Sequence, residues 1–169
     1  MPIENERKFI LPRDFDSQVL AGWQRREIKQ AYLNDGPRIR HIDNLCIFTY
    51  KKWVPQAKEL VEIELAISQD DFDLLWSQRV QTLQKVRFQR QIEEEEWVVD
   101  FLRDEEGHVF VVMAEVEMPR YQVSPKHIPE EIAAAILYAV DAGDNRFTNK
   151  KLSDPLYAAR MYEDVVTSV

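Results

Sequence analysis

Two carboxylates and an ammonium group occupy alternate positions near the start of the chain, at Glu4, Glu6 and Lys8. If this segment is a β-strand, alternate side chains point to one face and the two carboxylates lie about 7 Å apart. Like charges held this close repel each other, so a strand rarely keeps them on one face without a counterion. A divalent cation bound by both carboxylates, with the lysine holding an anionic group beside it, would satisfy the arrangement.

Several later segments repeat this alternation, and each carries charge of one sign. The charged or polar positions on one face are Arg38 and Arg40, Thr49 and Lys51, Glu62 and Glu64, Lys85 and Arg87, Asp100, and Glu115 and Glu117. Apolar residues such as Ile39, Val86 and Val116 lie between them. An ordinary sheet with one wet face also alternates, but it mixes polar residue types and avoids neighbouring like charges. The sorting by sign favours a barrel whose charged faces line one cavity and whose apolar outside is covered by helices.

A cavity lined by both signs suits a complex of a metal ion with a polyphosphate. Carboxylates bind the cation, while arginine and lysine bind the phosphate oxygens. The chain has only 4 glycines, so it lacks a glycine-rich phosphate loop, and any phosphate site must be built from side chains.

The elements that must position these charges are mostly strands. Alternation and turn signals predict strands over residues 2–10, 25–33, 37–41, 45–51, 58–67, 80–90, 95–103 and 108–118. Helices are predicted from Ser68, over 129–140 and over 156–166, with a short helix or turn over 13–21. Many strands joined by short turns indicate an α+β, mainly β fold with an antiparallel sheet or closed barrel.

Composition indicates one globular domain over residues 1–169. The chain is 45% hydrophobic and 31% charged, and no apolar run is long enough to cross a membrane. The single cysteine, Cys46, excludes an intramolecular disulfide framework and a cysteine-rich zinc site. With no secretory signal, we expect a cytoplasmic protein without a membrane partner. The net charge of −8 argues against general nucleic-acid binding.

The order of these motifs resembles that of a known family. Ile3-Glu4-Asn5-Glu6-Arg7-Lys8-Phe9-Ile10 is similar to the E-x-E-x-K signature of the CYTH, or triphosphate tunnel metalloenzyme, superfamily. The resemblance continues through Arg-Ile-Arg at 38–40, Thr-Tyr-Lys at 49–51, Glu-Ile-Glu at 62–64, Lys-Val-Arg at 85–87, Trp-Val-Val-Asp at 97–100, Glu-Val-Glu at 115–117 and Asp-Asn-Arg-Phe-Thr-Asn at 144–149. It covers residues 3–150 and leaves 151–169 as a helical C-terminal tail. The first motif looks closest to the bacterial inorganic triphosphatase branch.

The resemblance implies an eight-stranded antiparallel barrel, with helices packed outside, that forms a tunnel for a triphosphate. Its implied cofactor is Mg²⁺ or Mn²⁺. The implied metal ligands are Glu4, Glu6 and Glu117, with Glu115 close by. The implied triphosphate-binding residues are Lys8, Arg38, Arg40, Lys51, Lys85 and Arg87, with Arg146 and Lys150 closing the tunnel from the C-terminal side. A second acidic cluster, which could hold another metal ion or orient the basic side chains, comprises Glu62, Glu64 and Asp100.

The leading functional prediction is hydrolysis of inorganic triphosphate, with water oriented by a second metal ion or by a lysine, Lys8 or Lys51. The alternatives are a thiamine or nucleoside triphosphatase, a class IV adenylyl cyclase, and a non-catalytic module that binds polyphosphate or a nucleotide. The many acidic residues argue against a pure anion receptor. Leu156, Tyr157, Ala159 and Met161 in the tail could plug one tunnel end or form a homodimer contact.

Other conspicuous residues receive structural interpretations. His41, His108 and His127 share no metal-ligand spacing, although His41 directly follows the arginine pair and could approach substrate. The acidic run 93–96 is expected to be a solvated turn at the end of a hairpin. Trp53, two residues after Lys51, could shape the tunnel mouth.

Overall fold

Antiparallel strands make up most of the fold, as the alternation predicts. The computed structural model describes residues 4–167. Its strands are β1 (Glu6–Leu11), β2 (Gln24–Leu33), β3 (Arg38–Ile42), β4 (Leu45–Val54), β5 (Glu59–Ile67), β6 (Arg79–Ile92), β7 (Glu95–Arg103), β8 (Val109–Glu117) and β9 (Tyr138–Val140). Its helices are the 3₁₀ helix η1 (Ser17–Leu20), α1 (Gln69–Trp76), α2 (Glu130–Ala133), α3 (Asn149–Leu152) and α4 (Pro155–Thr167). The predicted α+β, mainly β class is confirmed. None of these helices is both long and apolar enough to cross a membrane.

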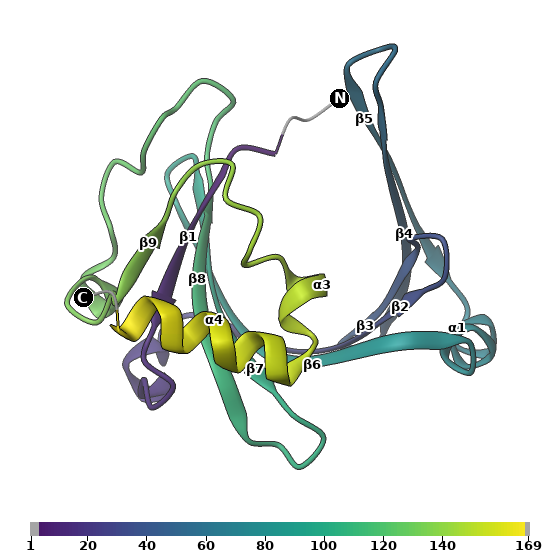
Figure 1. The fold of residues 1–169 in the computed structure, drawn as a ribbon, viewed down its shortest axis with the longest axis horizontal. Coiled ribbons are helices and arrows are strands. Elements are labelled where there is room, and N and C mark those ends of the chain that lie inside the picture. Colours follow the sequence, from purple (N-terminus) through teal and green to yellow (C-terminus); the bar gives the residue numbers. More distant parts are fainter. Residues whose placement is uncertain (1–3, 168–169) are drawn as a thin grey trace.

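The strands form one sheet that curves around a central space (Figure 1). Their order is β5-β4-β3-β2-β6-β7-β8-β1-β9, and all neighbouring strands are antiparallel. Within residues 4–167 the edge strands β5 and β9 each pair on one side only, so the sheet is not closed. The predicted eight-stranded closed barrel is thus corrected to a nine-stranded open sheet. Closure depends on backbone pairing between distant strands, which a local pattern does not specify.

The outer, convex face of the sheet carries most of the apolar residues. Phe9, Trp97 and Val99 pack in one cluster with Trp23 and with Ile132 of α2. A second cluster lies beneath α1 and contains Ala31, Ile39, Cys46 and Phe72. Burial of these residues stabilises the curved sheet and attaches η1, α1 and α2 to its outer face.

Helix α1 begins where the sequence predicts. Ser68 has extended backbone geometry, and its hydroxyl accepts a hydrogen bond of 3.0 Å from the backbone N–H of Asp71. Asp70 and Asp71 lie in the first turn, where carboxylates interact favourably with the helix dipole. This cap fixes the point at which the chain turns from β5 into the helix.

The predicted helix over 129–140 is wrong in its second half. Helix α2 ends at Ala133, and Tyr138–Val140 form strand β9 beside β1. The backbone N–H of Leu137 already donates to the carbonyl oxygen of Ile10 at 2.9 Å. Pairing with the otherwise free edge of β1 and burial of Val140 therefore outweigh the helix propensity of the alanine run.

The last two helices lie on the concave side of the sheet, which corrects the prediction that all helices pack outside. Ile10, Leu83, Leu102, Val111 and Met113 point inward and cluster with residues of this C-terminal segment. Those residues are Phe147, Leu152, Ala158 and Val165, with Tyr157 and Met161 packed against them. Figure 1 shows α4 crossing the strands on this side. The tail therefore fills part of the interior, while Leu156 stays 78% exposed.

This placement predicts different effects for two leucines in one segment. Leu152 is 1% exposed, so Leu152→Ala leaves a cavity and should lower the free energy of unfolding by about 2–5 kcal/mol. Leu156→Ala, the matched control, should change it by no more than about 0.5 kcal/mol. Urea denaturation followed by circular dichroism measures both values. Equal effects would mean that the segment does not pack in the interior as described.

Candidate functional site

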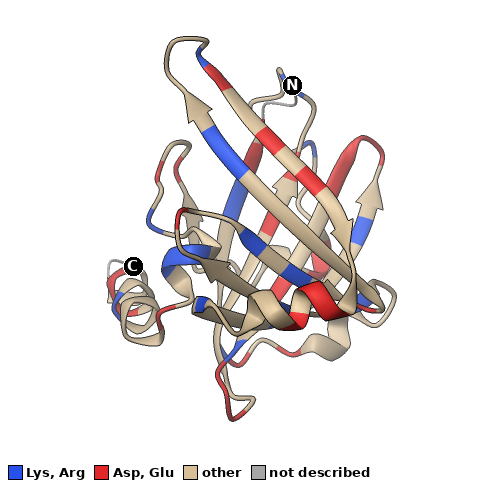
Figure 2. Ribbon diagram, turned by 90° about the vertical axis from the view of Figure 1, so that its right-hand side faces the viewer, with Lys and Arg blue, Asp and Glu red and all other residues tan. Residues whose placement is uncertain are grey.

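Strand register brings the predicted charged residues onto one concave surface. Residues directly opposite each other in an antiparallel pair point to the same face. Glu6 lies opposite Glu117, and Lys8 lies opposite Glu115. Figure 2 shows the resulting acidic and basic bands on the strands around the central space. This surface is called the inner face below.

A cavity of about 300 Å³ occupies the charged part of the inner face. Its lining residues are Glu4, Glu6, Lys8, Arg38, Arg40, Lys51, Glu62, Glu64, Arg87, Glu96, Val98, Glu115, Glu117 and Asn149. All of them are charged except Val98 and Asn149. Most residues predicted for metal and triphosphate binding therefore share one cavity. Of the other predicted residues, Lys85 and Asp100 are buried in the wall and are described next.

Asp100 is fully buried and binds two basic side chains. Its Oδ2 atom accepts a hydrogen bond of 2.9 Å from Lys85 Nζ. Arg87 donates to both oxygens, through Nε and Nη2, each at 2.8 Å. Burial opposes ionisation of Asp100, but the charges of Lys85 and Arg87 hold the pKa of its carboxyl below the ordinary value. Asp100 thus holds Arg87 against the cavity and orients basic side chains, one of its two predicted roles.

Lys85 links strands β6 and β7 to the C-terminal segment. Its Nζ also donates to Oδ1 of Asn149, the first residue of α3, at 3.3 Å. Burial lowers the pKa of Lys85 to about 8, although the Asp100 carboxylate acts in the opposite direction. The lysine is therefore costly to bury and depends on its two oxygen partners.

The basic wall of the cavity has more cationic groups than local partners. The Nε atoms of Arg38 and Arg40 are buried and have no hydrogen-bond partner among residues 4–167. Arg40 Nη2 lies 3.6 Å from an oxygen of Glu64. Burial, followed by the charges of Arg38 and Arg87, lowers the pKa of Arg40 to about 10. An anion with several oxygens would satisfy these donors.

On the acidic wall, the ionised forms of two carboxylates are disfavoured. Glu115 Oε1 is buried and lacks a hydrogen-bond partner within the described part of the chain. Burial, together with the charge of Asp100, raises the pKa of Glu115. Burial also raises the pKa of Glu117, helped by Glu96 and by Glu4. Both carboxylates would therefore be stabilised by a cation.

Lysines supply part of the counter-charge to the remaining acids. Lys8 Nζ lies 3.5 Å from an oxygen of Glu6 and donates to the carbonyl oxygen of Phe147 at 3.2 Å. Lys51 hydrogen-bonds to Glu4 and lies 3.6 Å from an oxygen of Glu62. The contact of Lys51 with Glu4 bridges β4 and the segment before β1, which the open sheet does not join through its backbone.

The acidic residues fit a hard divalent cation by their chemistry. Carboxylate oxygens are the ligands that Mg²⁺ and Mn²⁺ prefer, and Glu115 offers a buried oxygen that has no hydrogen-bond partner among the described residues. In the part of the chain that the structure describes, no three such side chains already converge as metal ligands. Of the predicted cluster of Glu62, Glu64 and Asp100, the two glutamates line the cavity, whereas the carboxylate of Asp100 is buried and paired with Lys85 and Arg87.

The predicted tunnel-closing residues, Arg146 and Lys150, do not line the cavity. Arg146 instead pairs with Asp144 at 2.9 Å, and Lys150 is exposed. The same segment reaches the cavity through Asn149 and through the carbonyl oxygen that binds Lys8. The sequence analysis assigned no role to Asn149, although the motif at 144–149 ends at this residue.

The interpretation of 93–96 as a solvated turn is wrong for Glu95 and Glu96. Glu96 lines the cavity and lies opposite Glu117. Glu95 is 2% exposed and accepts hydrogen bonds from Gln122 Nε2 at 2.5 Å and from the backbone N–H of Lys126 at 2.9 Å. The sequence could have placed Glu96 on the inner face, because it lies at an alternate position from Asp100 along β7 and alternate residues of a strand share one face.

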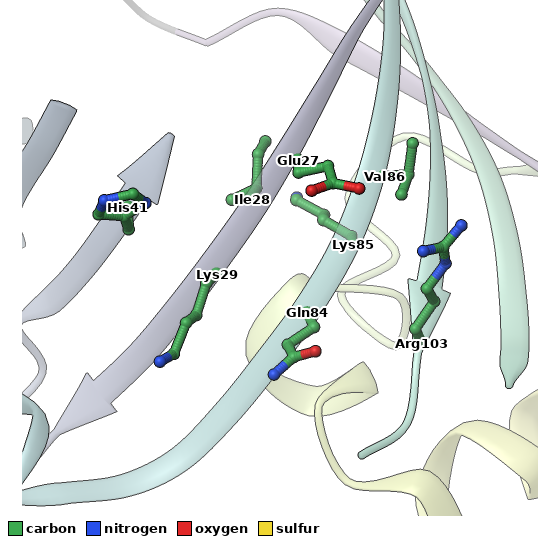
Figure 3. A pocket seen from close by; sticks show the side chains of 8 residues that line it. All are labelled: Glu27, Ile28, Lys29, His41, Gln84, Lys85, Val86 and Arg103. Carbon is green, nitrogen blue, oxygen red and sulfur yellow. The ribbon is translucent and has the colours of Figure 1, made fainter. Parts of the chain in front are cut away.

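A second cavity, of about 260 Å³, lies on the outer face over β2, β3 and β6 (Figure 3). His41 lines it together with Lys29 and Arg103. The ring of His41 packs edge-on against Phe72 of α1, with the ring centroids 5.8 Å apart. His41 therefore faces away from the charged cavity, unlike Arg40 beside it.

The Asp100 contacts predict a large stability effect of one carboxyl group. Asp100→Asn leaves Lys85 and Arg87 without a buried counter-charge, so the free energy of unfolding at pH 7 should fall by about 3–5 kcal/mol. Because the folded pKa of Asp100 is depressed, its contribution is complete above the unfolded pKa of about 3.9 and is lost as the pH falls through the folded value. Urea titrations should show the two proteins converging in acid.

Glu131→Gln is the control for this prediction. Glu131 pairs with Arg90 at 3.0 Å near the surface, and both side chains keep contact with solvent. Its loss should cost about 0–1 kcal/mol. An Asp100 effect no larger than this would show that the buried contacts are not formed.

Comparisons with known proteins give the fold and no closer relationship. No family model matches the sequence, and no curated protein matches it. Solved structures do match: the hypothetical protein NE1496 has a TM-score of 0.60 and 21% identity, covering 89% of this chain and 97% of that chain. A conserved hypothetical protein from Pyrococcus furiosus has a TM-score of 0.52 and 16% identity, covering 79% and 94%. A putative adenylate cyclase from Bacillus halodurans has a TM-score of 0.50 and 16% identity, covering 77% and 95%. These similarities show that the chain shares its fold with these solved structures.

Proposed function

We propose that this protein is a metal-dependent triphosphatase that hydrolyses inorganic triphosphate in the charged cavity. The supporting observation is the division of one cavity into two walls with unsatisfied groups of opposite sign. Within residues 4–167, Arg38 and Arg40 present buried Nε donors without hydrogen-bond partners, and Glu115 presents a buried oxygen without one. A triphosphate bound together with a divalent cation would satisfy both walls.

The composition of the cavity favours a bare triphosphate over one that carries an organic group. Among the lining residues that the structure describes, Val98 is the one apolar residue and none is aromatic. A nucleobase or a thiamine ring gains most of its binding energy from apolar contact and stacking. The charged cavity offers contacts to phosphoryl oxygens instead.

One observation supports a second candidate, a nucleotide substrate. Trp53 is 54% exposed and lies two residues beyond Lys51 on β4, so both side chains belong to the same face. An exposed indole near the cavity could stack on a base, and one structural neighbour is a putative adenylate cyclase. Cyclisation would use the ribose 3′-hydroxyl in place of water.

Binding and orientation are the main tasks of the side chains in this proposal. Arg38 and Arg40 bind the phosphate oxygens, and Asp100 holds Arg87 in position to stabilise the negative charge that develops during transfer. Water attacks the terminal phosphorus atom and the bond to the bridging oxygen breaks, which yields orthophosphate and pyrophosphate. Lys8 or Lys51 orients this water by hydrogen bonding.

The metal ion would be held on the acidic wall. Glu6, Glu115 and Glu117 offer its oxygen ligands, with Glu4 beside them. The ion would neutralise charge on the triphosphate and so assist the displacement.

A substrate panel tests the proposed function. With Mg²⁺ or Mn²⁺ present, we expect kcat/KM for inorganic triphosphate to exceed that for ATP or thiamine triphosphate by about tenfold or more, because the organic group finds little apolar contact in the cavity. Phosphate release and cyclic AMP are measured on the same samples. Predominant cyclic AMP from ATP would favour a cyclase, and tight binding without turnover would favour a receptor.

A single carboxylate tests the metal wall. Glu117→Gln removes a ligand charge and should lower metal-dependent turnover by about a hundredfold or more. Because the folded pKa of Glu117 is raised, its ionised form is disfavoured by folding, so the variant should be no less stable than the parent at pH 7. Glu163→Gln, on the exposed side of α4, is the matched control. Undiminished turnover in Glu117→Gln would remove this residue from the metal site.

A further inference from the structure

Arg26 lies on β2 next to the basic wall of the cavity; it is not itself a lining residue, and no sequence motif singled it out. It lies directly opposite Arg87, a lining residue, in the pairing of β2 with β6. Alternate residues of β2 face the lining arginines of β3 in the same way, with Gln30 opposite Arg40 and Tyr32 opposite Arg38. Arg26 therefore belongs to the inner face.

The guanidinium of Arg26 has few partners. Its Nη2 donates to Gln24 Oε1 at 3.3 Å, and its Nε is buried without a hydrogen-bond partner among residues 4–167. No carboxylate in that range forms an ion pair with it. The next arginine along the chain differs, because Arg25 pairs with Glu27 at 3.0 Å on the opposite face.

Two arginines directly opposite each other on one face repel, unless an anion lies between or beside them. Asp100 compensates Arg87 from the side of β7. Arg26 lies on the other side of Arg87, where the described residues provide no such carboxylate. Of the two arginines, Arg87 therefore has a carboxylate partner and Arg26 has none among the described residues. The guanidinium of Arg26 lies on the same inner face as the phosphate-binding arginines.

The position of Arg26 along β2 suggests what it binds. Gln30 lies opposite Leu83, which packs beneath the C-terminal helices, whereas Arg26 lies four residues away from that filled end. Strand β3 ends opposite Ile28, so Arg26 has only β6 beside it. The adjacent pair, Gln24 opposite Gln89, is polar. This polar pair suits additional phosphoryl oxygens, and the apolar Val98 lies opposite Gln89 on the same face.

We propose that Arg26 binds a phosphoryl group beyond the three of triphosphate, so that the cavity accepts longer linear inorganic polyphosphates. This inference rests on the proposed function, since it extends the same site. A bare phosphate chain continues with identical anionic units, and each added unit brings oxygens for a guanidinium to bind. Arg26 is accordingly a determinant of chain length.

Equilibrium binding in metal-free buffer tests the inference apart from catalysis. Isothermal titration calorimetry with inorganic triphosphate and tetraphosphate compares the parent protein with Arg26→Ala and Arg26→Gln. We expect either substitution to weaken tetraphosphate binding by about tenfold or more, and triphosphate binding by a smaller factor. Arg25→Ala, the matched control on the outer face, should leave both affinities unchanged. Thermal unfolding checks that each variant is folded, and Arg26→Gln keeps the test valid if the alanine variant is not.

The outcomes separate the two claims. Equal losses for both ligands, or no loss for either, would overturn the role of Arg26 in chain length. A selective loss for tetraphosphate supports that role even if the parent protein fails to hydrolyse triphosphate. In that case the proposed hydrolysis fails while the extended binding site stands.

Discussion

The buried carboxylate of Asp100 is the interaction on which the rest of the charged cavity depends. Two cationic side chains of β6, Lys85 and Arg87, converge on it. The pKa of Arg40 is lowered by burial, then by the charge of Arg38 and by that of Arg87. Without a central anion these groups would be desolvated and mutually repulsive. Asp100 also joins β7 to β6 and, through Lys85 and Asn149, joins the sheet to α3. The carboxylate of Asp100 therefore helps both to position the basic wall and to hold the C-terminal segment against the sheet.

Ion pairs between lysines and glutamates of the cavity can be replaced by contacts with a bound cation and a bound phosphate. Lys8 is close to Glu6 on the same strand, and Lys51 on β4 is close to Glu4, so each lysine offsets the charge of one acid in the cavity. In the proposed function, a cation and a triphosphate arrive together. The carboxylates can then exchange their contacts with the lysines for contacts with the cation, and the lysines can bind phosphate oxygens. The number of contacts between opposite charges changes little. This exchange would avoid leaving a partly buried charge unpaired.

The two-residue period of the strands made the inner face predictable from the sequence, and the same rule would have found Glu96. Closure was not predictable, because it depends on whether β5 meets β1 or β9, and their residues are far apart in sequence. Strand β9 was missed because Ala133 and its neighbours have high helix propensity, while the edge of β1 that recruits Tyr138 is remote. The sequence pattern places the carboxylates of Asp100 and Glu62 on the same face. The three-dimensional structure shows that Asp100 is buried against Lys85 and Arg87, whereas Glu62 lines the cavity.

The inner face has two zones, and this division accounts for the position of the tail. Along β6 the inward residues change from Leu83 to Lys85 and Arg87, and along β8 from Met113 to Glu115. The apolar zone must be covered to exclude water, and helices α3 and α4 cover it with Leu152 and their other buried side chains. The charged zone gains nothing from an apolar cover, because its groups would lose their solvation. The helices therefore cover the apolar zone, and α3 meets the charged zone through its first residue, Asn149, which lines the cavity.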